Sequence, residues 1–324
     1  PTFMEEWRKG WHPEKIEPKG PSSKVLIIGS GPAGLEAALA CSNRGYEVTL
    51  TESLDVIGGR VTKERKLPGL SAWGRVADYR EYQLSQKSNV ETYLQSELDA
   101  NQILEFGFEN VCIATGSTWR ADGVSRQHVI PIPNDSKMKI FTPDDIMEGK
   151  LPNGKVILYD DDHYYMGGVI AELLIQQGCE VTLVTPCAFV SEWSKNTLEQ
   201  GEIQKRLIEM GVKLELNKGV IRIDSSGVTT NCIYSQKEER LEAESVVIVA
   251  SRKPNDQLYE ELKEKKNEWQ DFGLQTVKLI GDANAPGPIA WATYAGHRYA
   301  RELDTKDIGD AVPFRREITN LSSN

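Results

Sequence analysis

The stretch KVLIIGSGPAG at positions 24–34 decides the fold class of this chain. The apolar residues after its lysine predict a buried strand, and the glycine-rich turn runs directly into the helix-forming stretch 35–44. Gly45 ends that helix, and residues 46–52 predict the next strand. Strand, glycine turn, helix and strand in this order form the βαβ unit of dinucleotide-binding domains.

A second copy of this unit begins at Lys155. Residues 155–159 predict its first strand, 169–177 its helix and 180–184 its second strand, and Gly178 ends the helix. Both copies open with Lys-Val and carry Glu-Val-Thr-Leu in the second strand. We therefore predict an α/β protein with two Rossmann-like domains, the second inserted in the first.

Other patterns complete the two units. Further strands are predicted at 90–96, 110–114, 246–250 and 276–280, a meander of short strands at 212–216, 219–223 and 228–234, and helices at 259–269 and 291–303. The proline-rich stretch 118–154 is predicted to be a crossover between the two domains. The predicted organisation is an N-terminal linker segment (1–21), a nucleotide-binding domain (22–118 plus 274–305), a second domain (119–273) and a C-terminal tail (306–324).

Composition excludes several classes of function. The 38 basic and 48 acidic side chains give a net charge of -10, which argues against nucleic acid as a partner. Apolar runs are far shorter than the roughly 18 residues of a membrane span, and the first residues do not resemble a secretory signal. The five cysteines are scattered, so they predict neither a disulfide framework nor a metal site. We expect a soluble, cytoplasmic protein.

The first glycine turn carries the chemistry of nucleotide binding. Gly29 permits the tight bend, Gly31 lets the backbone approach a pyrophosphate, and Gly34 lets helix and strand pack closely. The helix N-terminus offers N–H groups to the phosphates. Glu52 ends the next strand 18 residues after Gly34, near the distance of ~20 residues expected for a carboxylate that binds ribose hydroxyls. An adenine dinucleotide, or at least its ADP half, is predicted here.

Three further motifs follow in order: Gly58-Gly59-Arg60, Ala114-Thr115-Gly116 and Gly281-Asp282-Ala283. With the first turn they resemble the flavin-binding domain of the glutathione-reductase-like flavoproteins. The resemblance implies that Gly281 and Asp282 contact the ribityl chain of FAD, and that the helix near Ile289 and Ala290 points its N-terminus at the flavin. The predicted cofactor-binding residues are Gly29, Gly31, Pro32, Ala33, Gly34, Glu52, Ser53, Gly59, Arg60, Ala114, Thr115, Gly116, Gly281 and Asp282.

The resemblance narrows to one family. Motifs at 5–14, 57–59, 67–70, 78–80, 113–116, 279–283, 293 and 296–298 are similar, in the same order, to the C-terminal part of trimethylamine dehydrogenase and its relatives dimethylamine and histamine dehydrogenases, themselves similar to 2,4-dienoyl-CoA reductase. The likeness covers essentially the whole chain. It implies a nucleotide-binding module without the N-terminal flavin barrel and without an iron–sulfur cluster. The implied partner is the missing barrel domain or a redox partner protein.

The second unit departs from a nicotinamide site. Its first turn reads YDDDHYYM at 159–166, and Gly167 and Gly168 come only inside the helix. Carboxylates repel a pyrophosphate and bulky side chains keep the backbone away from it, so NAD(P)H binding is disfavoured. Helix capping explains the acidic run more simply than a metal does, because consecutive residues on a turn cannot all converge on one ion.

No residue is predicted as an acid, base or nucleophile. A dithiol relay is excluded because the sequence has no Cys-x-x-Cys, Cys112 reads as a buried hydrophobe, and His297 as a packing residue. The leading hypothesis is a flavoprotein module that binds FAD through its ADP moiety. The alternatives are a non-catalytic ADP-binding structural module and a stand-alone NAD(P)H-dependent flavin oxidoreductase. Whether the chain is itself an enzyme, and which substrate and electron acceptor it serves, stay open.

Overall fold

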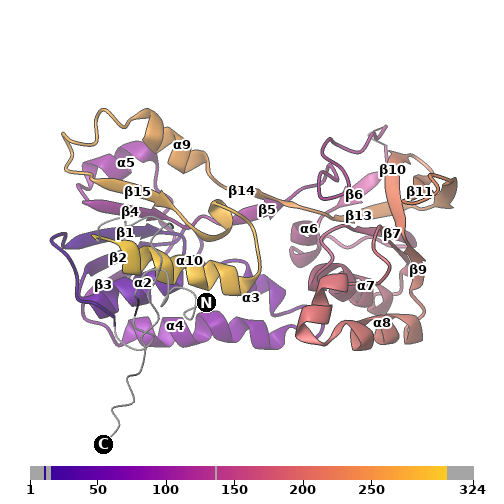
Figure 1. Ribbon diagram of the computed structural model, residues 1–324, viewed down its shortest axis with the longest axis horizontal. Coiled ribbons are helices and arrows are strands. Elements are labelled where there is room, and N and C mark those ends of the chain that lie inside the picture. The colour runs from indigo at the N-terminus through magenta and orange to yellow at the C-terminus, as the bar shows by residue number, and fades with distance from the viewer. Residues whose placement is uncertain (1–10, 12–15, 136, 305–324) are drawn as a thin grey trace, which may run out of the picture. The chain divides into compact units, whose positions relative to one another are not determined.

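A computed structural model describes residues 11, 16–135 and 137–304 (Figure 1). Most of the predicted linker at 1–21 and all of the predicted tail at 306–324 lie outside these residues. The described residues divide into two compact units. The first comprises residues up to Val61, Arg75–Gly116 and those from Pro254 onward, and the second comprises Thr62–Gly74 and Ser117–Lys253.

The first unit is built on a five-stranded parallel sheet with the strand order β15-β4-β1-β2-β3. Its strands are β1 (Lys24–Ile28), β2 (Glu47–Thr51), β3 (Val90–Tyr93), β4 (Asn110–Ile113) and β15 (Thr276–Leu279). Its helices are α2 (Pro32–Arg44), α4 (Arg75–Ser85), α5 (Ala100–Glu105), α9 (Gln257–Glu264) and α10 (Ile289–Glu302), with the short turn η3 (Gly281–Ala283). Because the strands are parallel, their carboxyl ends meet at one edge of the sheet.

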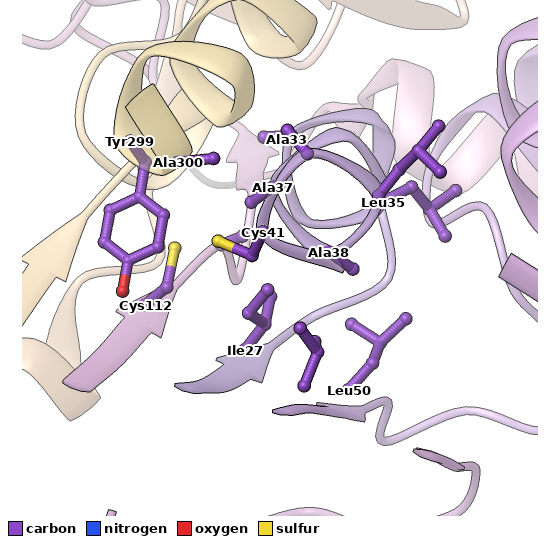
Figure 2. Packing of buried hydrophobic residues seen from close by; sticks show 14 of the residues in the cluster. Ile27, Ala33, Leu35, Ala37, Ala38, Cys41, Leu50, Cys112, Tyr299 and Ala300 are labelled. Carbon is purple, nitrogen blue, oxygen red and sulfur yellow. The ribbon is translucent and has the colours of Figure 1, made fainter. Parts of the chain in front are cut away.

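Strand β1 shows how the sequence builds two layers of helices on this sheet. Val25 and Ile27 face a core shared with α2, α4 and α10, whereas Leu26 and Ile28 face a core shared with α5 and α9 (Figure 1). Every apolar side chain of the strand is buried, as expected for a strand covered on both faces. Figure 2 shows the first core, where α2 turns small side chains toward the strands and toward Tyr299 of α10. These small side chains let α2 and α10 approach closely.

A half-buried ionic network also joins three helices of the first unit. The Glu36 carboxylate of α2 lies 2.6 Å from Arg80 Nε of α4 and 2.9 Å from His297 Nδ1 of α10. Burial alone would raise the pKa of Glu36, but the hydrogen bond from His297 and the charge and hydrogen bond of Arg80 outweigh it and lower that pKa below its ordinary value. His297 therefore has a structural contact, in keeping with the packing role expected for it.

Glu36→Gln should lower the free energy of unfolding by about 2 kcal/mol at pH 7, because Arg80 and His297 lose their charged partner. A carboxyl whose folded pKa is depressed stabilises the fold above its unfolded pKa and loses that contribution as pH falls through the folded pKa. The difference from the parent should therefore shrink below pH 4.5. Urea unfolding from pH 7 to pH 3 measures it. Glu260→Gln, which breaks an exposed pair with Lys263, is the matched control; an equal effect there would contradict the prediction.

The second unit contains a five-stranded parallel sheet, a three-stranded antiparallel sheet and a two-stranded one. Their orders are β6-β13-β7-β8-β9, β10-β11-β12 and β14-β5. The strands are β5 (Ser117–Trp119), β6 (Lys139–Phe141), β7 (Lys155–Asp160), β8 (Glu180–Thr185), β9 (Lys213–Leu216), β10 (Lys218–Asp224), β11 (Gly227–Cys232), β12 (Glu238–Glu242), β13 (Ser245–Val249) and β14 (Arg252–Pro254). The helices are α3 (Val61–Glu64), α6 (Pro143–Met147), α7 (Tyr165–Gln176) and α8 (Gln200–Glu209), with the turns η1 (Ser71–Gly74) and η2 (Glu192–Thr197).

The structure corrects the predicted meander. Strand β9 pairs in parallel with β8 and so belongs to the second parallel sheet. The antiparallel meander consists of β10, β11 and β12 instead. The sequence did not reveal β12 because its charged stretch has no alternating apolar pattern and is almost wholly exposed.

The unit boundaries also differ from the predicted domain boundaries at 118 and 273. Helix α9 belongs to the first unit, because Leu262 is fully buried in the core with Leu104 and Val277. The segment Thr62–Gly74 belongs to the second unit, where Leu67 and Leu70 enter the core. Short segments with so few apolar residues give no sign in the sequence of which core they join. Within the described ranges, no helix is long and apolar enough to cross a membrane.

Candidate nucleotide-binding site

The site is built on the turn between β1 and α2. Gly29 has φ +98°, and a Cβ atom there would lie 2.5 Å from the carbonyl oxygen of Ala114. A Cβ atom on Gly34 would lie 1.9 Å from the carbonyl oxygen of Gly29. A Cβ atom on Gly31 would meet nothing within 4 Å among the described residues. Gly29 and Gly34 are therefore required by the fold, whereas the space beside Gly31 is open to a ligand.

Helix α2 begins at this turn with its N-terminus uncapped. Gly31 is the N-cap residue and Pro32 takes the first helical position, so Ala33 and Gly34 are the next to offer N–H groups. Among the described residues, no side chain caps this end and its first turn holds no acidic residue. Free N–H groups and the positive end of the helix dipole are what a phosphate group needs.

Glu52 lies at the end of β2 and is held against the turn. Its Oε2 accepts hydrogen bonds from Ser30 N at 2.9 Å and Ser30 Oγ at 2.7 Å. Its Oε1 accepts from Leu54 N at 3.0 Å and Ser53 Oγ at 3.2 Å. The carboxylate is buried, yet the Ser53 hydroxyl is exposed and free to turn away, which would release a lone pair of Oε1 to a ribose hydroxyl.

The loop after Glu52 returns to the turn. Gly58 N donates to Ser30 O at 3.0 Å, and a Cβ atom on Gly59 would lie 3.0 Å from Gly31 Cα. Gly59 has φ +56°, so a side chain here would be both strained and crowded. The half-buried Arg60 follows directly. Ser30 thus links Glu52 and this loop to the turn. This role was not predicted, because the motif pattern assigns a function to its glycines and leaves the residue between Gly29 and Gly31 unspecified.

The motif that ends β4 contacts the same turn. Ala114 N donates to Ile28 O at 2.8 Å, which continues the sheet beyond β4. Thr115 Oγ1 donates to Asn255 O at 2.5 Å, and Asn255 Nδ2 donates back to Thr115 O at 3.1 Å. Asn255 N also donates to Gly116 O at 3.0 Å. Asn255 therefore fixes the Ala-Thr-Gly motif, although no pattern around it indicates this.

The last motif follows β15. Gly281 has φ +59°, and a Cβ atom there would lie 2.6 Å from Ala33 Cβ of α2. Asp282 Oδ1 accepts from Gly287 N at 3.0 Å and so fixes the loop before α10. Helix α10 begins after Pro288 without a side-chain cap from any described residue and without an acidic residue in its first turn. A second positive helix end therefore belongs to this motif.

The structure brings all the predicted cofactor-binding residues to the carboxyl edge of one sheet. In parallel α/β sheets, ligands bind outside this edge, where helix N-termini and strand ends converge. The arrangement combines an open backbone approach at Gly31, two uncapped helix ends and a carboxylate at Glu52. Together these groups suit a nucleoside diphosphate, with its anionic phosphates and its ribose hydroxyls.

The corresponding turn of the second unit is filled by its own side chains. Asp160 Oδ1 accepts from Asp162 N at 3.2 Å and His163 N at 3.1 Å. Burial raises the pKa of Asp160 to about 7, although the charge of His163 opposes this. A Cβ atom on Gly167 would lie 2.4 Å from the Asp160 carboxylate. The amides of this turn are thus already bonded. Within the described ranges, no group of three or more His, Cys, Asp or Glu could hold a metal ion.

Fold and site together define a dinucleotide-binding α/β protein with two Rossmann-like units. The chain belongs to the pyridine nucleotide-disulphide oxidoreductase family, which matches residues 23–276. It is 37% identical to dimethylamine dehydrogenase of Hyphomicrobium sp., over 98% of this chain and 46% of that protein. The solved structure of histamine dehydrogenase from Rhizobium sp. 4-9 matches all of this chain and 50% of its own, with 59% identity and a TM-score of 0.94.

A further solved structure, 6-hydroxypseudooxynicotine amine oxidase from Pseudomonas geniculata N1, is 41% identical with a TM-score of 0.89 over 94% of this chain and 45% of its own. The chain therefore spans about half the length of these relatives. The predicted fold class is confirmed, and so is the resemblance to the nucleotide-binding part of the amine dehydrogenases.

Proposed function

We propose that this chain is the FAD-binding module of a flavin-dependent amine dehydrogenase and that it holds FAD through the ADP moiety. The observation that carries the proposal is the open approach at Gly31 beside the uncapped N-terminus of α2, with the Glu52 carboxylate fixed next to it. The similarity to proteins named as amine dehydrogenases and as an amine oxidase also supports this proposal.

Each group of residues has a part in holding the ligand. The backbone from Gly31 to Gly34 binds the pyrophosphate, and Gly59 and Arg60 border it on the side of the returning loop. Glu52, with Ser53 turned aside, accepts from the adenosine ribose. Gly281, Asp282 and the N-terminus of α10 bind the ribityl and flavin end. The protein would orient the flavin and tune its electronic properties, and bound FAD would supply hydride or electron transfer.

A second candidate ligand is ADP alone. Asp282 Oδ1, which would face the ribityl chain of FAD, already accepts a hydrogen bond from Gly287 N. The groups predicted to bind the adenosine diphosphate, by contrast, have an open approach at Gly31. In that case the module would be structural, and redox chemistry would belong to a separate flavin domain. NAD(P)H binding by the second unit is disfavoured because Asp160 already bonds the amides that a pyrophosphate would use.

The test is the absorbance spectrum of the purified chain, followed by heat release of its ligand and chromatography. We expect a yellow protein that releases FAD. A colourless protein that releases ADP would establish the second candidate, and a protein that binds neither FAD nor ADP when they are added would overturn both. Rapid bleaching of the flavin by NADH or NADPH would instead support a stand-alone reductase.

A further inference from the structure

Helix α10 packs directly against the backbone of α2 at Gly296. A Cβ atom on Gly296 would lie 2.2 Å from the carbonyl oxygen of Ala33 and 2.8 Å from the amide nitrogen of Ala37, both in α2. Ordinary contacts of a Cβ atom lie at 3.4–4 Å. In Figure 2, Ala33 and Ala37 face the stretch of α10 that carries Tyr299 and Ala300. Only a residue without a side chain lets the two helices come this close.

Two polar contacts hold the later part of α10 on the same helix. His297 Nδ1 lies 2.9 Å from Glu36 Oε1, and Arg44 Nη1, at the end of α2, donates to Leu303 O at 2.9 Å. Arg44 is only 5% exposed. A guanidinium at the C-terminal end of α10 also interacts favourably with the negative end of that helix dipole. The close approach at Gly296 is therefore maintained as far as the end of α10.

Helix α2 has fixed contacts on its other sides, whereas α10 has one main neighbour. A Cβ atom on Gly34 would lie 1.9 Å from Gly29 O, so α2 lies tightly on the end of β1. Glu36 of α2 also bonds to Arg80 of α4 at 2.6 Å. The apolar side chains of α10 pack into the core that this helix shares with α2. A steric clash between the two helices would therefore displace α10 rather than α2.

The two helices serve different parts of the proposed ligand. Helix α2 begins after Gly31, beside the pyrophosphate, and Glu52 lies on the adenosine side. Helix α10 begins at Ile289, after the Gly281 motif, on the ribityl and flavin side. Gly296 lies about two turns after the start of α10. A movement of α10 at Gly296 therefore shifts the groups for the flavin end and leaves those for ADP in place.

We propose that Gly296 is a positioning residue that gives the site its selectivity for whole FAD over ADP. The inference rests on the proposed function, which assigns the flavin end of the ligand to α10 and the Gly281 motif. Gly296 acts through α10: its missing side chain keeps the uncapped N-terminus of this helix where the flavin end requires it. Lengthening the 2.2 Å approach to an ordinary 3.4 Å contact would move α10 by about 1 Å. Such a shift weakens interactions that depend on the distance to a helix end.

The test compares two ligands on the same chain. Calorimetric titrations of ligand-free Gly296→Ala with FAD and, separately, with ADP give the two affinities. We expect the FAD affinity to fall by about tenfold or more and the ADP affinity by less than about twofold, because only FAD reaches the groups that α10 positions. A purely structural role of Gly296 would lower the free energy of unfolding and leave the ratio of the two affinities unchanged.

A second variant loosens the helix without adding bulk. His297→Ala removes the bond to Glu36 and introduces a residue that favours helix formation. It should lower the FAD affinity by about threefold and leave the ADP affinity unchanged. Gly201→Ala is the matched control, because it makes the same change in α8, in open space and in the unit without the proposed site. It should change neither affinity. Circular dichroism checks the fold of each variant.

The parent chain separates this inference from the proposed function. If the parent binds FAD and folded Gly296→Ala keeps the parental ratio of FAD to ADP affinity, the inference is wrong and the proposed function stands. If Gly296→Ala does not fold, an unchanged ratio in His297→Ala has the same meaning. A parent that binds FAD no more tightly than ADP has no selectivity for Gly296 to supply, which also overturns the inference. Binding of neither ligand would overturn the inference and the proposed function together.

Discussion

Gly31→Asp should give a folded protein that no longer binds its nucleotide. Gly31 has an ordinary φ of -68°, and a side chain there meets no described atom within 4 Å. The new carboxylate would instead occupy the space of the pyrophosphate. Two like charges about 5 Å apart near a protein surface repel by about 3 kcal/mol, so we expect affinity for FAD or ADP to fall by about 100-fold or more. Calorimetric titration of the ligand-free chain measures this loss.

The matched control for this change is Gly201→Asp. Gly201 lies in the first turn of α8, also with open space around it, and in the unit that does not carry the proposed site. It should leave affinity and fold unchanged. If Gly31→Asp retained parental affinity while folded, the phosphates would have to bind elsewhere, and the proposed site would be wrong.

Sequence patterns predicted the first unit well because each of its signals is local. The apolar run of β1, the glycines of the turn and Glu52 lie within one βαβ unit, so their spacing alone implies their positions. The later motifs at Ala114 and Gly281 were placed by resemblance, and the structure shows that both contact the turn, at Gly29 and at Ala33 respectively. The small residues at these positions allow that close approach.

Features formed by long-range contacts could not be predicted. Asn255 bonds the Ala-Thr-Gly motif across 140 positions of sequence, and nothing near it suggests a partner. Ser30 was overlooked although it lies inside the motif, because a serine between two glycines has many possible roles.

Gly34→Ala should destabilise the first unit, although it lies only three residues from Gly31. Its Cβ would lie 1.9 Å from the backbone oxygen of Gly29, so α2 would have to move away from β1. Overpacking against backbone outweighs the gain in helix propensity. We expect the free energy of unfolding to fall on the order of 3 kcal/mol. Denaturant unfolding should be measured on ligand-free protein, because a bound nucleotide adds its own stabilisation.

Gly201→Ala separates the steric clash from the gain in helix propensity. This change brings the same gain in propensity in α8, where the added methyl group lies within 4 Å of no atom of the described residues. It should stabilise the chain by about 0.5–1 kcal/mol. Opposite signs at the two positions would show that Gly34 serves the contact between helix and strand. A stabilising Gly34→Ala would mean that α2 lies farther from β1 than described. In that case the N-terminus of α2 would not be held against the strand ends, and the pyrophosphate site built on it would fail as well.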